Sequence, residues 1–119
     1  MIRCDMEGAT GIVSMEQSDP SGKEYDSGRN MFNLDLRAVI EGLNEAGADE
    51  IYVYDEHFYG RNVELADLPK NIHVICGKPP YRPDWAGGLD STFAGLVLVG
   101  LHSMALTPSA LLAHTYEEE

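Results

Sequence analysis

The chain has 119 residues, which is enough for one domain with a modest core. Hydrophobic residues make up 44% of it and charged residues 24%, which is typical of a globular protein and excludes a disordered or fibrous one. Eight lysine and arginine residues against 20 aspartate and glutamate residues give a formal net charge of −12. Because so acidic a chain repels phosphate backbones and anionic lipids, we expect no nucleic-acid partner and no membrane partner, whereas cations suit it.

Charged residues interrupt the beginning of the chain, and the longest apolar run, 93–101, is too short to cross a bilayer. These features predict a cytoplasmic protein. The two cysteines, Cys4 and Cys76, form no Cys-x-x-Cys pair, and each lies in an apolar run. We therefore expect both of them to be buried, reduced thiols.

The hydrophobic pattern predicts strands and one clear helix. A first strand is expected at 2–4. After a long loop, one apolar face of a helix that ends at Gly47 is formed by Phe32, Leu36, Val39, Ile40, Leu43 and Ala46. Further strands are predicted at 49–55, 72–76 and 93–101, separated by connections rich in glycine and proline.

This order of elements predicts the fold class. A strand, a helix and a second strand in succession imply a right-handed crossover and a parallel pair. Strands that are apolar along nearly their whole length are typical of a sheet covered on both faces. We expect residues 1–119 to form a single α/β metal-binding catalytic domain with a mostly parallel sheet, flanking helices and a site at the carboxyl ends of the strands.

Residues of metal-ligand type follow three of the predicted strands. The first strand runs into Asp5 and Glu7, the second into Asp55, Glu56 and His57, and the last into His102. In an extended chain Asp5 and Glu7 point to the same side, where their charges repel unless a cation lies between them. Carboxylates combined with imidazoles suit Zn²⁺ or a similar first-row metal better than Ca²⁺ or Mg²⁺. Because closed structural zinc sites are rich in thiolates, a metal here is expected to be catalytic.

Each of these residues also has an ordinary structural interpretation. Asp5 can accept backbone hydrogen bonds in the following loop, His57 can be a partly buried loop histidine, and His102 can be a core histidine. Their shared position at carboxyl strand ends favours the site. His73 is expected to face solvent at the opposite end. His114, twelve residues after His102, is by spacing alone either a ligand or an acid, base or nucleophile beside the metal.

An ordered set of motifs resembles the zinc-dependent D-aminopeptidases of the DppA type. The set comprises Asp5-Met6-Glu7-Gly8, Tyr25 with Gly28-Arg29, Asp55-Glu56-His57, Gly88-Leu89-Asp90-Ser91-Thr92-Phe93 with Gly95, Gly100-Leu101-His102, and Thr107-Pro108 followed by His114-Thr115. Each motif alone has little specificity, but their order and spacing fit over nearly the whole chain, up to about Tyr116.

The resemblance implies a metal-dependent aminopeptidase, a hydrolase that releases D-amino acids from the amino terminus of small peptides and holds two zinc ions. By position, Asp5 would bridge the two ions, Glu7 and His57 would complete the first, and His102 would belong to the second. His114 lies at the position of the proposed catalytic residue. Two metals can bind the amino terminus, polarise the scissile carbonyl and stabilise the developing oxyanion.

The family pattern extends beyond this chain. Family members carry a later glutamate ligand for the second metal and a second domain that shapes the pocket and ring-like oligomers, so the chain is expected to be truncated relative to them. We expect it to self-associate, to hold at most one metal firmly and to show little turnover alone. Two alternatives remain: a metal-binding or assembly module without turnover, and a metallohydrolase of another amide or of a phosphoester.

Overall fold

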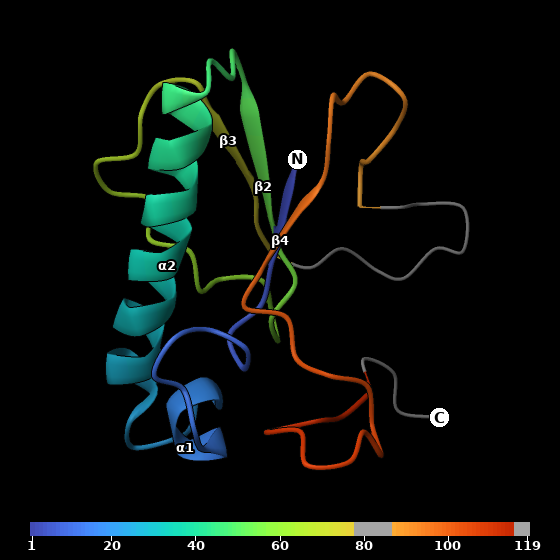
Figure 1. The fold of residues 1–119 in the computed structure, drawn as a ribbon. Coiled ribbons are helices and arrows are strands. Elements are labelled where there is room, and N and C mark those ends of the chain that lie inside the picture. The colour runs from blue at the N-terminus through green and yellow to red at the C-terminus, as the bar shows by residue number, and fades with distance from the viewer. Residues whose placement is uncertain (78–86, 116–119) are drawn as a thin grey trace.

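A parallel sheet organises the fold. In the computed structural model, which describes residues 1–77 and 87–115, four strands pair in the order β3-β2-β1-β4, and every pair is parallel. The strands are β1 (Ile2–Cys4), β2 (Ile51–Asp55), β3 (Ile72–Ile75) and β4 (Val97–Val99). Because all strands run in one direction, their carboxyl ends lie at one edge of the sheet (Figure 1). The predicted α/β fold with a parallel sheet is confirmed.

A long helix covers one face of this sheet. The helix α2 (Tyr25–Glu45) lies alongside the strands (Figure 1). Its largest buried apolar side chains recur at intervals of four residues and are Phe32, Leu36 and Ile40. They form one hydrophobic core with Ile2 and Val53, which occupy paired positions on β1 and β2. The apolar spacing predicted this face, whereas the polar first turn, which begins at Tyr25, lies outside the apolar pattern.

The hydrophobic pattern does not predict the second helix, α1 (Met15–Ser18). A single turn is too short to display a hydrophobic period. The Gln17 side chain accepts the backbone N–H groups of Val13 (2.8 Å) and Ser14 (3.1 Å) and donates to the carbonyl of Gly11 (3.1 Å). These bonds close the turn, which packs beside the beginning of α2 (Figure 1).

Two sequence expectations are wrong in detail. The apolar run 93–101 forms a strand only at β4, because Phe93 is in a turn closed by its N–H bond to the Asp90 carbonyl, and Gly100 has a φ of +67°. Cys76 lies beyond the end of β3 and is exposed, so the expectation that both thiols are buried holds only for Cys4.

The two faces of the sheet are covered differently. Val97 and Val99 contribute to the core beneath α2, whereas Leu98 points to the other face and is 60% exposed. Within residues 1–77 and 87–115 no helix lies on that other face (Figure 1). The face is covered in part by the chain itself, because Tyr54, which shares it with Leu98, is only 5% exposed and lies close to Gly87. Neither helix of the described part is long and apolar enough to cross a membrane.

Candidate metal centre

The carboxyl ends of β1 and β2 place three chemistry-bearing side chains together. Asp5 directly follows β1, and its backbone N–H bonds the Val99 carbonyl at 2.9 Å, which extends the sheet ladder past the strand end. Glu7 lies two residues further, and His57 lies two residues beyond the end of β2. Asp5 is 1% exposed, and Glu7 and His57 are each 4% exposed. The sheet therefore fixes two carboxylates and an imidazole in a buried position.

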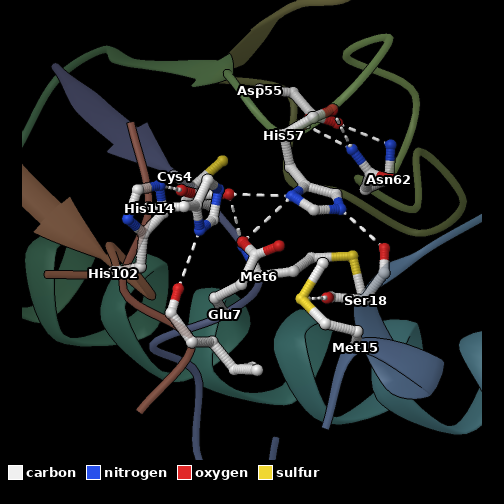
Figure 2. A network of polar contacts seen from close by, with 12 residues as sticks. Cys4, Met6, Glu7, Met15, Ser18, Asp55, His57, Asn62, His102 and His114 are labelled. Carbon is white, nitrogen blue, oxygen red and sulfur yellow. Dashed lines mark hydrogen bonds and ion pairs between the residues drawn. The ribbon is translucent and has the colours of Figure 1, made fainter. Parts of the chain in front are cut away.

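The three side chains converge on one nitrogen atom. His57 Nδ1 lies 2.9 Å from Asp5 Oδ1 and 3.1 Å from Glu7 Oε2 (Figure 2). Nδ1 carries at most one proton, so it cannot donate to both carboxylates. Glu7 Oε2 is buried and makes no hydrogen bond to any residue that the structure describes. One ligand atom from each residue lies within 4.8 Å of the others, so the group fits a divalent cation.

The protonation of His57 reflects this environment. Burial by itself lowers the pKa of His57, but its close contacts with Asp5 and Glu7, the charge of Glu7 and the bond to the Ser18 carbonyl raise that pKa to about 10. Without metal, His57 is therefore an imidazolium at neutral pH, and its single positive charge offsets part of the negative charge of the two carboxylates. A metal that binds here must displace the proton on Nδ1.

The other ring nitrogen of His57 is held by the backbone. Nε2 lies 2.7 Å from the carbonyl oxygen of Ser18, and Figure 2 shows the ring between Glu7 and Ser18. A carbonyl oxygen only accepts, so Nε2 carries a proton, and in the neutral ring Nδ1 has the lone pair. The nitrogen with metal-binding capacity is the one that faces the carboxylates.

Buried polar contacts anchor the loop that carries His57. Asn62 Nδ2 donates to Asp55 Oδ1 (2.8 Å) and to the His57 carbonyl (2.7 Å), and Asp55 Oδ2 accepts the N–H groups of Asn62 and Val63. The Tyr25 hydroxyl donates to Asn62 Oδ1 at 2.5 Å. Asp55 is thus occupied by its own loop, although it also lies at a strand end. No sequence motif indicates Asn62, because its role depends on contacts formed only in the fold.

His102 lies on the opposite side of Asp5 from His57. Its Nε2 is 3.5 Å from Asp5 Oδ2, and its side chain is 2% exposed. His102 Nδ1 lies 2.8 Å from the Ser103 carbonyl, so in the neutral ring Nε2 has the lone pair. Asp5 therefore faces one histidine with each of its carboxylate oxygens. Whether His102 binds metal stays a prediction.

Close backbone approach brings His102 to this position. The Gly8 N–H donates to the Gly100 carbonyl at 2.8 Å. A Cβ on Gly8 would overlap the Leu101 carbonyl oxygen, and one on Gly100 would overlap that of Asp5. Any larger residue at either position would push the two segments apart. These two motif glycines let the β4 end lie against the loop after β1.

His114 lies next to His102. Their rings stack with centroids 3.6 Å apart and planes inclined by 19° (Figure 2). His114 Nδ1 is 2.7 Å from the carbonyl oxygen of Leu112, so in the neutral ring Nε2 has the lone pair. The structure thus brings Asp5, Glu7, His57, His102 and His114 into one region. His73, by contrast, is exposed within β3, where it stacks on Tyr52.

Comparison with known proteins agrees with the motif pattern. A model of the D-aminopeptidase family, Peptidase_M55, matches residues 1–119. The chain belongs to the D-aminopeptidase family. A D-aminopeptidase of Bacillus subtilis (strain 168) is 29% identical over 108 residues, which make up 90% of this chain and 39% of that protein. The solved structure of the Zn-dependent D-aminopeptidase DppA of Bacillus subtilis, a self-compartmentalizing protease, matches with a TM-score of 0.84. That match has 28% identity and covers 97% of this chain and 42% of the solved chain.

Membership of the D-aminopeptidase family confirms the resemblance inferred from the motifs. The chain spans about two fifths of the length of these relatives. Within that span, the motif residues Asp5, Glu7, His57, His102 and His114 come from four separate segments of the sequence. The roles of these residues as ligands or as a catalytic group remain predictions.

Proposed function

We propose that this chain is the metal-binding part of a zinc-dependent aminopeptidase that releases D-amino acids from the amino terminus of small peptides. The observation that carries the proposal is the buried convergence of Asp5, Glu7 and His57 at the carboxyl edge of the sheet. Family membership supports the peptidase class, and the relative DppA is named as zinc-dependent. Substrate and activity are proposed for the whole protein.

The protein groups suit a site for two zinc ions. Asp5 would bridge them, because Oδ1 faces His57 and Oδ2 faces His102. Glu7 and His57 would complete the first site, and His102 would belong to the second. Backbone carbonyls hold the remaining nitrogen of each histidine, an arrangement that orients imidazole ligands. Bound zinc supplies a Lewis acid beside the scissile carbonyl.

His114 is the proposed catalytic residue. Its stacking on His102 supports a location beside the proposed second zinc. The Leu112 carbonyl holds a proton on Nδ1, so Nε2 is the atom that would take up or release a proton during turnover. An imidazole that transfers protons through Nε2 cannot also coordinate the metal through that atom.

We further propose that the protein forms homo-oligomers in the cytoplasm. The relative DppA is described as self-compartmentalizing, and this chain exposes large apolar side chains, among them Leu98 and Met104. A free, exposed thiol at Cys76 is compatible with a reducing compartment.

A chimera tests the proposed activity. This chain would replace the corresponding part of the Bacillus subtilis D-aminopeptidase, and the release of alanine from D-alanyl-D-alanine and L-alanyl-L-alanine would be measured with zinc and after chelation. We expect zinc-dependent cleavage of the D-peptide only. His114→Ala in the chimera should keep its zinc and lose most of its turnover.

The same assay separates the alternatives. Hydrolysis of p-nitrophenyl phosphate without peptide cleavage would indicate a metallohydrolase of phosphoesters. A folded chimera that binds zinc but cleaves neither peptide would indicate a binding module. Zinc loss in His114→Ala would make His114 a ligand and contradict its proposed role.

A further inference from the structure

Ser18 contacts a proposed zinc ligand although it has no metal-binding group facing the site. Its carbonyl oxygen accepts from His57 Nε2 at 2.7 Å, and Ser18 itself is fully buried. This bond determines which nitrogen of the neutral His57 ring faces Asp5 and Glu7. The position of the Ser18 backbone therefore controls how His57 is presented to a metal.

Ser18 is the last residue of α1, a single turn that has little stability of its own. The turn packs against α2, and Gly28 lies where the two helices meet. A Cβ on Gly28 would overlap the carbonyl oxygen of Gln17 and would lie 2.9 Å from the Gln17 Cβ. Because the overlapped atom is backbone, α1 would have to move if Gly28 carried a side chain.

We propose that Gly28 is a positioning residue for the metal centre. Its missing side chain lets α1 approach α2 closely enough for the Ser18 carbonyl to bind His57 Nε2, which leaves Nδ1 for the metal. The inference rests on the proposed function in one respect, namely that zinc binds at Asp5, Glu7 and His57. The link from Gly28 to the His57 ring can be tested without metal.

Two alanine variants on the same helix provide the test. Gly42 also lies in α2, but a Cβ there would meet no atom of the described residues within 4 Å. Both Gly28→Ala and Gly42→Ala gain the helix propensity of alanine, so they differ mainly in the clash with α1. Gly42→Ala is therefore the matched control for Gly28→Ala.

Zinc affinity is the first readout, measured by competition with a chromophoric chelator on variants whose folding is checked by circular dichroism. We expect Gly28→Ala to bind zinc about 10- to 100-fold more weakly than the wild type, the range typical for losing a group that orients a ligand. Gly42→Ala should bind zinc as the wild type does. A folded Gly28→Ala protein with wild-type zinc affinity would overturn the proposal.

The His57 ring is the second readout, observed by nitrogen-15 NMR. In zinc-loaded wild type, Nδ1 should bind the metal and Nε2 should carry a slowly exchanging proton. Metal bound through Nε2 would overturn the proposal directly, even if Gly28→Ala failed to fold. If Gly28→Ala does not fold, Gln17→Ala takes its place as the test variant. It loosens α1 without adding atoms and should show the weakened zinc affinity.

The metal-free protein separates this proposal from the proposed function. If the wild type bound no zinc, the proposed function would fail, yet the His57 Nε2–H signal could still be compared among the variants. It should be protected in the wild type and in Gly42→Ala and exchange rapidly in Gly28→Ala. Equal protection in all three would contradict the positioning role of Gly28.

Discussion

Asp5 connects the two halves of the candidate site, because each of its carboxylate oxygens faces a different histidine. If it bridges two ions, Asp5→Ala should lower the affinity for both, whereas His57→Ala should mainly affect the first. Calorimetric titration with zinc measures both affinities, and His73→Ala, an exposed histidine in β3, is the control. Loss of the same single zinc in Asp5→Ala and His57→Ala would argue against bridging.

The protonation of His57 makes the stability of the metal-free protein depend on pH. The folded state raises the pKa of His57 from 6.5 to about 10. A raised pKa stabilises the fold fully below 6.5, and this contribution is lost as the pH rises through the folded value. We therefore expect the free energy of unfolding of the metal-free protein to fall between pH 6.5 and 10.

Urea unfolding across this pH range measures the effect. His57→Gln should lack most of the decline, because its side chain does not titrate. An identical decline in the wild type and His57→Gln would show that other groups cause it. Zinc affinity should rise with pH over the same range, because the metal must displace the Nδ1 proton.

Among the elements, the hydrophobic pattern predicts α2 and the parallel sheet, but it does not predict α1, the short turn that contacts His57. Phe32, Leu36 and Ile40 mark the helix because they recur at helical spacing and are all buried. The turn α1 has no comparable pattern, and the Ser18 contact is made by a backbone carbonyl, a group that every residue carries. The Ser18 carbonyl contacts His57 because α1 packs against α2 at Gly28, and not because the residue is a serine.

The positions of residues at strand ends correctly predicted which residues lie close together. They did not predict which hydrogen bonds each of these residues makes. Asp5, Glu7 and His57 converge because parallel strands end at one edge. Asp55 also ends a strand, yet its oxygens bind Asn62 and Val63. Sequence position alone does not distinguish a carboxylate that faces the site from one that closes a loop.

Asn62 is expected to support both the fold and the metal centre. Asn62→Ala leaves the buried Asp55 carboxylate and His57 carbonyl short of a donor, which should lower the free energy of unfolding by about 1–3 kcal/mol. Zinc affinity should fall as well, because the loop carrying His57 loses an anchor. Denaturant unfolding and zinc titration measure these two effects.

Asn71→Ala is a suitable control for Asn62→Ala. Its side chain donates one partly buried hydrogen bond, to Asn44, on a segment away from the candidate site. We expect it to cost about 0.5–1.5 kcal/mol of stability and to leave zinc affinity unchanged. If Asn62→Ala likewise kept wild-type zinc affinity, the loop would be structural only.

At the scale of the whole molecule, the uneven cover of the sheet predicts self-association. Parallel sheets are normally covered on both faces, but Leu98 is 60% exposed on the face that carries no helix in the described ranges. We expect light scattering to show oligomers of the purified chain and Leu98→Lys to shift them toward monomer. The variant should keep its zinc, because Leu98 lies outside the site. A wild-type chain that stays monomeric at high concentration would contradict this expectation.

Zinc binding by Asp5, Glu7 and His57 can be observed by anomalous X-ray diffraction at the zinc edge. Crystals of the chain grown with zinc should show a strong peak about 2.0–2.2 Å from both carboxylates and from His57 Nδ1. Crystals of Asp5→Ala should lack that peak. A wild-type crystal with no peak at these three residues, or with zinc bound only elsewhere, such as at the exposed His73, would contradict the account.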